Sequence, residues 1–297
     1  MTRAGQLKFE NRQPREGINI SRRPPLKKFF MLLISAAILI TVLVVVLQFS
    51  GAWIARKIPF RVEQAATEHL EVELGNNQAS PPMVAWLNQL ADKLSRHMAL
   101  PPTMTITVHY SDEDIFNAYA TLGGQLVSFR GLLAAMPNEN ALAMVMAHEI
   151  SHVLHRDPLA GLGGGLASML ALYAVTGQGT SSGATSLLNQ TGLLTGVQFT
   201  RHMESEADRV ALDAVAATYG HVNGADTLFR LTGDQQHLTA VPEWLQRFAS
   251  THPLDSDRVQ AIAGMAAQAA YSSSGATTPL PAEFDLWLHG DGAQQNR

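Results

Sequence analysis

The sequence predicts an α+β protein that is mostly helical, with one short antiparallel sheet and one N-terminal transmembrane helix. Three observations predict this class: a long uncharged apolar run near the N-terminus, three short segments of alternating residues, and apolar residues at helical spacing over much of the remaining chain. The hydrophobic content of 46% is sufficient for a core. Cysteine is absent, which excludes disulfide frameworks, thiolate metal sites and a cysteine nucleophile.

The first 50 residues predict a basic tail followed by a membrane anchor. Residues 1–28 carry eight Lys or Arg against two Glu, without apolar periodicity, so we expect a disordered tail. The anchor, residues 29–50, opens with 21 uncharged residues that would span roughly 32 Å as a helix, the thickness of a bilayer's hydrocarbon core. This run is long for a cleaved signal peptide, the alternative interpretation, so we favour an uncleaved anchor.

The charge distribution predicts on which side of the membrane the rest of the chain lies. The positive-inside rule keeps the basic tail in the cytoplasm and sends residues 51–297 across the membrane. A single-pass protein of a bacterial inner membrane, with its domain in the periplasm, is the simplest interpretation. The whole chain carries −4 and residues 1–28 carry +6, so the remainder carries −10. An acidic outer part argues against nucleic acid as a partner.

Residues 51–270 form the predicted main domain, and residues 271–297 a C-terminal tail to which we assign no function. Helical periodicity in the domain, apart from the central helix discussed below, predicts helices at 61–74, 83–98, 200–219, 225–232, 242–249 and 255–270. Alternation predicts strands at 104–110, 116–121 and 125–129, the last two joined as a hairpin. We expect one antiparallel sheet beside the central helix.

Residues 159–200 contain no charged side chain. Apolar content predicts helices at 166–175 and 187–199, separated by a Gly/Ser/Thr loop. Ten apolar residues between glycine-rich stretches are too few for a second membrane span. Core packing is the preferred interpretation, and a helical hairpin that dips into the membrane surface or covers a cleft is the alternative.

The central helix contains Ala147-His148-Glu149-Ile150-Ser151-His152. Two imidazoles four residues apart lie on the same helical face, where a single tetrahedral metal ion such as zinc can take both. Glu149 follows the first histidine directly, which is where a general base can reach a water molecule bound at that ion. The alternative is two helix histidines and a glutamate on a polar face.

A catalytic zinc normally has three protein ligands. The best further candidates open the helix at 200–219, where Glu204 and Asp208 share a face. Glu204 would complete a His2Glu set, and Asp208 would accept the second ring N–H of His148, which fixes its tautomer. Alternatively, these carboxylates stabilise the N-terminus of that helix through its dipole.

The motif, together with Glu204-x-Glu206-Ala207-Asp208, resembles the gluzincin metallopeptidases that include the CaaX prenyl protease and the HtpX protease. The resemblance covers roughly residues 60–262 and includes Asn117-Ala118-Tyr119-Ala120, Gly131-Leu132-Leu133, Asn138-Glu139-Asn140-Ala141-Leu142-Ala143, and Ser250-Thr251-His252-Pro253 followed by Arg258. It implies a zincin-like metallopeptidase domain.

The resemblance also implies roles for individual residues. His148, His152 and Glu204 would bind one Zn²⁺ per chain, with Glu149 as base and Asp208 orienting His148. His252 would face the cleft and help to stabilise the oxyanion, and Arg258 would be structural. Apart from the resemblance, we interpret His155 as an ordinary histidine of the last helical turn; the alternative is a spare ligand or a hydrogen-bond partner for the site.

The expected function is that of a membrane-anchored zinc metalloendopeptidase acting on unfolded or misassembled envelope proteins. The substrate would lie extended along an edge strand near 124–129. The resembling proteins have several spans whereas this chain shows one, which indicates a single-anchor envelope branch. Because the catalytic domain is expected to face away from the cytoplasm, a CaaX substrate is not expected. A zinc hydrolase of non-peptide substrates and a non-catalytic, membrane-tethered chaperone or binding module remain as alternatives. The sequence makes no prediction of the oligomeric state.

Overall fold

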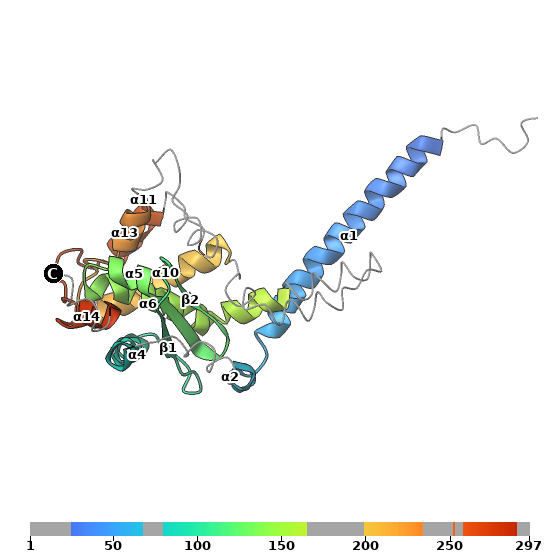
Figure 1. Ribbon diagram of the computed structural model, residues 1–297. Coiled ribbons are helices and arrows are strands. Elements are labelled where there is room, and N and C mark those ends of the chain that lie inside the picture. Colours follow the sequence, from blue (N-terminus) through green and yellow to red (C-terminus); the bar gives the residue numbers. More distant parts are fainter. Residues whose placement is uncertain (1–24, 68–79, 165–198, 234–251, 253–257, 290–297) are drawn as a thin grey trace, which may run out of the picture.

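A computed structural model of the chain describes residues 25–67, 80–164, 199–233, 252 and 258–289 (Figure 1). Several predicted elements lie outside these residues: most of the basic tail, the helices at 166–175 and 242–249, the loop between 177 and 186, and nearly all of the helix at 187–199. Within the described part the protein is mostly helical with one small sheet, as predicted.

The N-terminal helix α1 (Pro25–Ala55) contains the predicted anchor and extends beyond it. Its segment Leu26–Ala55 contains an 18-residue stretch with a mean hydropathy of 3.1, and the helix is long and apolar enough to cross a membrane. Figure 1 shows α1 as a straight rod whose C-terminal end meets the rest of the described protein. Its apolar side chains are largely exposed along the rod, whereas Ala55 at the end is buried.

The sheet contains β1 (Thr107–Ser111), β2 (Ala118–Ala120) and β3 (Gln125–Phe129), in the order β1-β3-β2. β2 and β3 pair antiparallel across the turn η1 (Leu122–Gly124), which confirms the predicted hairpin. β1 and β3 pair parallel, so the sheet is mixed and the prediction of a wholly antiparallel sheet is wrong. The hairpin docks on β1 through its second strand, and this places β3 in the centre.

The central position of β3 has a consequence for substrate binding. A central strand already pairs on both sides, and its five residues are all buried. The prediction of an edge strand near 124–129 is therefore wrong. β2 is an edge strand of this sheet and lies next to the central helix, with which it makes close contacts.

The predicted helices inside the described residues are confirmed, with ends displaced by a few residues. They are α2 (Phe60–Thr67), α4 (Pro81–Ser95), α6 (Glu139–His155), α10 (Arg201–Tyr219), α11 (Thr227–Gly233) and α13 (Arg258–Gln268). Two further short helices were not predicted from the sequence, α5 (Arg130–Ala135) and α14 (Phe284–His289).

The helix α6 runs through the core and is buried over most of its length. The side chain of Asn138 caps its first turn by accepting the N–H of Ala141 at 2.9 Å. Arg156 ends it in the left-handed conformation, with φ of 62°. The helix α10 packs along α6, begins at the Thr200 cap and ends at Gly220. These two helices form the frame that carries the polar site.

The segment after α13, treated above as a C-terminal tail, contributes to the core. Phe284 and Leu288 of α14 are buried, and the Phe284 ring packs edge-on against Trp86 of α4. Upstream, Thr278 accepts the N–H of Glu139 at 2.9 Å and donates its own N–H to Asn140 at 2.7 Å. This part of the chain therefore fixes the N-terminal end of α6.

Candidate metal centre

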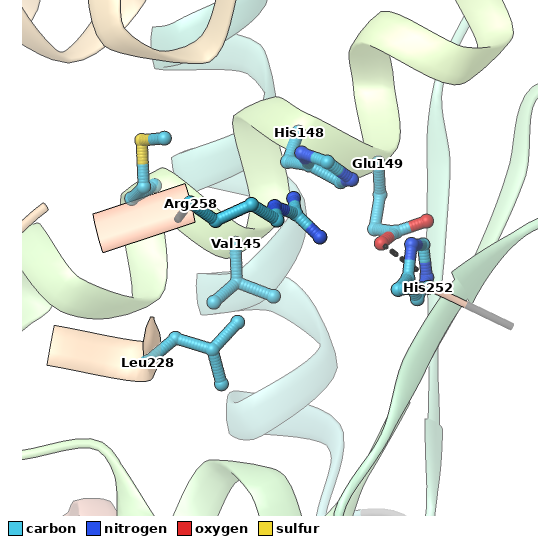
Figure 2. A pocket seen from close by; sticks show the side chains of 7 residues that line it. Val145, His148, Glu149, Leu228, His252 and Arg258 are labelled. Carbon is cyan, nitrogen blue, oxygen red and sulfur yellow. Dashed lines mark ion pairs between the residues drawn. The ribbon is translucent and has the colours of Figure 1, made fainter. Parts of the chain in front are cut away.

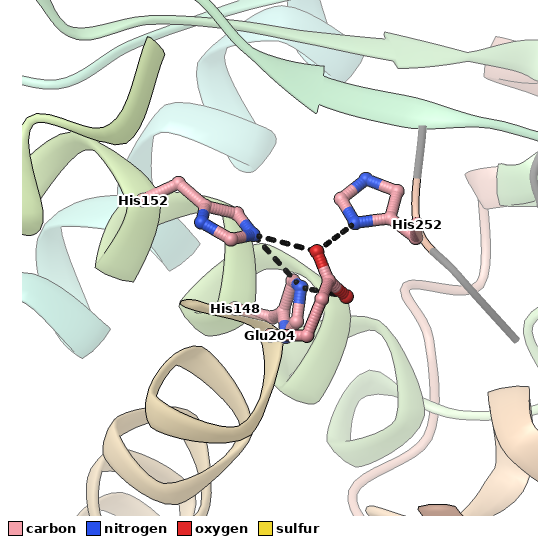
Figure 3. Close-up of side chains that lie close together, drawn as sticks. All are labelled: His148, His152, Glu204 and His252. Carbon is pink, nitrogen blue, oxygen red and sulfur yellow. Dashed lines mark hydrogen bonds and ion pairs between the residues drawn. The ribbon is translucent and has the colours of Figure 1, made fainter. Parts of the chain in front are cut away.

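The two histidines of the motif meet on one face of α6. The Nε2 atoms of His148 and His152 lie 3.1 Å apart, and both rings are almost completely buried (Figure 3). The spacing of four residues produces this geometry, because one helical turn places the second imidazole above the first.

Glu204 comes to the same point from the first turn of α10. Its Oε1 lies 3.4 Å from Nε2 of His152, and its Oε2 lies 3.5 Å from Nε2 of His148. The Thr200 cap sets the start of α10 and thereby the direction of this side chain, which is 3% exposed. The structure thus brings together the three residues predicted as metal ligands, 52 residues apart in sequence between His152 and Glu204.

The hydrogen bonds of the two imidazoles show that this cluster fits a cation. Nδ1 of His148 donates to Asp208 at 2.8 Å, and Nδ1 of His152 donates to Asp157 at 3.0 Å. In the neutral form of each ring, these bonds leave the lone pair at Nε2, and both Nε2 atoms face the Glu204 carboxylate. Three electron-pair donors directed at one buried point require a positive charge between them. Two imidazoles and one carboxylate are a donor set typical of catalytic zinc.

The pKa shifts of His148 and Glu204 report opposite charge preferences at the imidazoles and at the carboxylate. Burial lowers the pKa of His148, but hydrogen bonds to Asp208 and Glu204 outweigh burial and raise it to about 10. Burial raises the pKa of Glu204, but the surrounding histidines, His252 first, outweigh burial and lower it. The surroundings therefore favour a cation at the imidazoles and an ionised carboxylate at Glu204.

Glu149 lies on the side of the site that faces the sheet. Its Oε2 accepts the N–H of Ala120 in β2 at 2.8 Å, and its Oε1 lies 3.3 Å from Nε2 of His252 (Figure 2). The side chain is buried, and the backbone of the edge strand fixes its orientation. The predicted base is thus placed between the histidine pair and the sheet edge.

His252 lies between two carboxylates. Its Nδ1 is 3.1 Å from Oε1 of Glu204, and its opposite nitrogen points to Glu149. The residue is 1% exposed and belongs, with His148, His152 and Glu204, to a group whose ligand atoms all lie within 4.8 Å of one another. The structure therefore places it in contact with the site.

Asp208 and Arg258 form a support behind His148. Nε and Nη2 of Arg258 lie 3.0 and 2.7 Å from the two oxygens of Asp208, and Nη1 lies 2.8 Å from Oε2 of Glu204. Burial raises the pKa of Asp208, but His148 and Arg258 outweigh burial and lower it. Arg258, expected only to be structural, thus contacts a candidate metal ligand directly.

Two neighbours of His152 were not identified from the sequence. One is Asp157, whose carboxylate accepts the Nδ1–H of His152. The ring of Phe199 stacks on the imidazole with centroids 3.9 Å apart, and it lies in a segment whose pattern predicted only a helix. The one feature of the sequence that could have indicated the contact between Asp157 and His152 is that Asp157 follows His152 by five residues, just beyond the end of the helix.

His155 lies away from this group. Its Nδ1 contacts Ser151 on α6, and its Nε2 is 3.9 Å from Oε1 of Glu206. Its side chain is 34% exposed.

A pocket adjoins His148 and Glu149 (Figure 2). It is lined by these two residues, His252, Arg258 and the apolar side chains of Met144, Val145 and Leu228.

Comparison with known proteins matches the chain to a family model and to several proteases. A family model described as Peptidase family M48 matches residues 82–266. Among curated proteins, the chain is 29% identical over 196 residues to the beta-barrel assembly-enhancing protease of Escherichia coli, covering 60% of this chain and 38% of that protein. It is 30% identical over 150 residues to the mitochondrial metalloendopeptidase OMA1 of Schizosaccharomyces pombe, covering 49% and 42%.

A third relative aligns over more of its length. The HtpX protease homologue of Methylibium petroleiphilum is 26% identical over 223 residues, covering 72% of this chain and 71% of that protein. The chain spans well under half the length of the first relative. The residues that the family model matches include the motif of α6 and the start of α10.

Proposed function

This chain belongs to peptidase family M48, and on that premise we propose that it is a membrane-anchored zinc endopeptidase that cleaves unfolded or misassembled envelope proteins. The observation that carries the proposal is the convergence of His148, His152 and Glu204 on one buried point, with the Glu149 carboxylate beside it. We assign the first three residues as ligands of one Zn²⁺ and Glu149 as the general base. Zinc, when bound, polarises the scissile carbonyl and lowers the pKa of water.

Glu149 is held for proton transfer. The N–H of Ala120 occupies its Oε2, so that Oε1 is the oxygen that takes a proton from the attacking water. The same oxygen then delivers this proton to the leaving amine. The bond to β2 keeps the carboxylate from rotating away and aligns it with the sheet edge.

β2 is the strand on which we place the substrate. An extended peptide that adds to this edge makes main-chain hydrogen bonds that do not depend on its side chains. Because Glu149 is bonded to Ala120, a peptide on the β2 edge passes next to the base. Recognition of this kind favours unfolded segments over folded domains.

His252 is proposed to donate a hydrogen bond to the oxyanion. Its Nδ1 contact with Glu204 orients the ring, and its Nε2 is on the side of Glu149. A donor at this position stabilises the charge that develops on the carbonyl oxygen. Asp208 is proposed to hold His148 in the tautomer that leaves Nε2 free for the metal.

The location of the protein follows from α1. We propose that residues 29–50 anchor the chain in a bacterial inner membrane, that residues 1–28 remain in the cytoplasm, and that the domain from residue 51 acts in the periplasm. The length and hydropathy of α1 and the basic residues before it support this orientation. The name of the relative from Escherichia coli, a beta-barrel assembly-enhancing protease, supports a role in envelope quality control.

The test uses the full chain in detergent micelles with unfolded casein as substrate. We expect cleavage that stops with a chelator and returns with zinc, and a Glu149→Gln variant that retains zinc but loses activity by about 10²–10⁴-fold or more. Glu206→Gln serves as the matched control and should remain active, because Glu206 is a half-buried carboxylate on α10 that pairs with Arg209. Normal turnover by Glu149→Gln would refute the assignment of the base. A zinc-loaded wild type without cleavage would favour a non-peptide hydrolase or a binding module instead.

A further inference from the structure

The C-terminal end of α1 is attached to the domain by direct contacts and not by a free linker. Gly163, in the helical stretch 157–164 after α6, lies so close to α1 that a Cβ there would come within 2.6 Å of the Gly51 carbonyl and 2.7 Å of the Ala55 side chain. Arg156 donates to the carbonyl of Ile58 at 2.8 Å and pairs with Glu63 of α2. The end of the metal helix is therefore clamped to the segment that leaves the anchor.

One contact of this attachment continues to the metal site. Nη2 of Arg56, the residue that follows α1, lies 3.1 Å from Oδ1 of Asp157. The other oxygen of the same carboxylate, Oδ2, accepts Nδ1 of His152 at 3.0 Å. Asp157 is buried, with 3% of its side chain exposed, and His152 is completely buried, whereas Arg56 is 40% exposed. A single carboxylate thus connects the end of the anchor to a candidate zinc ligand.

We propose that Arg56 is a positioning residue of the zinc site, which holds the Asp157 carboxylate in the orientation that fixes the His152 ring. The proposal rests on the zinc site argued above and extends it to the segment that directly follows the anchor helix α1. A carboxylate behind a metal-bound imidazole sets its tautomer and raises its basicity only while the carboxylate itself is held. Without Arg56, the Oδ1 atom of Asp157 loses its charged partner, and the carboxylate can rotate away from His152.

The effect is expected in zinc affinity, since the interaction acts through a ligand and not on substrate. Removal of residues that support ligands typically weakens metal binding by about 10–100-fold. Asp157→Ala should fall within that range, and Arg56→Ala, one residue farther from the metal, should fall at or below its lower end. Lys57→Ala is the matched control, because Lys57 is the neighbouring cation and lies over the Trp53 ring instead.

The experiment measures zinc dissociation constants of full-length variants in lipid nanodiscs by competition with a fluorescent chelator. We expect weaker zinc binding for Arg56→Ala, wild-type binding for Lys57→Ala, and no further loss when Arg56→Ala is added to Asp157→Ala. The last result defines action through Asp157, because independent effects would add. Denaturation of each variant in excess chelator identifies any loss of folding, which is separate from metal affinity.

Two results would overturn the inference. The first is an Arg56→Ala protein that binds zinc as tightly as Lys57→Ala, and the second is a double variant in which the two losses simply add. Both leave the proposed function intact, provided that the wild type binds one zinc. A wild type that binds no zinc would instead refute the proposed function itself, so the two failures are distinguishable.

Discussion

Nδ1 of His148 lies 2.8 Å from Oδ1 of Asp208, and this bond joins the metal helix α6 to the helix α10 that supplies Glu204. The bond has a structural and a chemical effect, since it locks the register of the two helices and directs Nε2 of the imidazole toward the ligand cluster. A carboxylate in this position is a common partner of metal-bound histidine.

Asp208→Asn tests this relationship. The amide retains the shape of the side chain but loses the charge, so we expect zinc affinity to fall by about 10–100-fold while the fold is preserved. Competition with a chelator measures the affinity. Asp213→Asn is the control, because Asp213 lies on the same helix but pairs with Arg209 and Tyr271 at the surface. Equal affinities for the two variants would contradict the role of Asp208.

Arg258 neutralises two buried carboxylates, so the cost of removing it, in free energy of unfolding, should depend on whether zinc is bound. In the zinc-free protein, Arg258→Ala leaves Glu204 and Asp208 without their guanidinium, and removal of one partner of a buried pair costs about 3–5 kcal/mol. Zinc supplies replacement charge at Glu204, so the cost should be smaller in the loaded protein. Urea denaturation with excess chelator and with excess zinc gives the two free energies of unfolding. The same loss in both conditions would show that Arg258 does not share the charge of the site.

The turn between β2 and β3 requires glycine. Gly123 has φ of 69°, and a Cβ there would lie 2.3 Å from the hydroxyl of Thr67 in α2. We expect Gly123→Ala to lower the free energy of unfolding by more than about 1 kcal/mol. Gly264 of α13 is helical with open space around it, so Gly264→Ala should raise stability by up to about 1 kcal/mol. Thermal denaturation should therefore shift in opposite directions, and shifts of the same sign would contradict this account of the turn.

Two tyrosines of the sheet region predict a loss of stability in alkali. Burial raises the pKa of Tyr119 to about 12, and burial with a hydrogen bond to Asp112 raises that of Tyr110 to about 12 as well. Between the ordinary pKa of 10.0 and 12, the unfolded chain loses these protons while the folded protein keeps them. The free energy of unfolding therefore falls as pH rises through this interval, and the contribution is complete below pH 10.

Replacement by phenylalanine removes this contribution. Denaturation in excess chelator between pH 9 and pH 12 should show a shallower decline for Tyr119→Phe and for Tyr110→Phe than for the wild type. Lysine titration affects all three proteins alike and cancels in the comparison. Identical slopes would mean that these phenols ionise at the same pH in the folded and unfolded states.

The sequence predicted those parts of the fold that depend on local periodicity. Helix α10 is confirmed from its Thr200 start to its Gly220 stop, and the β2–β3 hairpin is confirmed at its glycine turn. The pairing of β1 was predicted wrongly, because alternation identifies a strand but carries no information about which neighbour it joins. The same error led us to expect the substrate beside β3, which is the central strand of the sheet.

In the site, too, the residues placed by helical spacing were predicted, and those placed by tertiary packing were not. The spacing of His148 and His152 follows from one helical turn, and the helix face shared by Glu204 and Asp208 follows from another. Asp157 could not be recognised in this way, since it follows the helix end and reaches His152 only because Arg156 turns the chain in the left-handed conformation. The contact of Arg258 with Glu204 joins segments 54 residues apart, and only tertiary packing creates it.

The most direct measurement of the central claim is an anomalous difference map at the zinc absorption edge, from crystals of the zinc-loaded chain. We expect one peak per chain, about 2.0–2.2 Å from Nε2 of His148, Nε2 of His152 and a carboxylate oxygen of Glu204. A peak elsewhere, or a zinc bound by the histidines with Glu204 outside coordinating distance, would contradict the account.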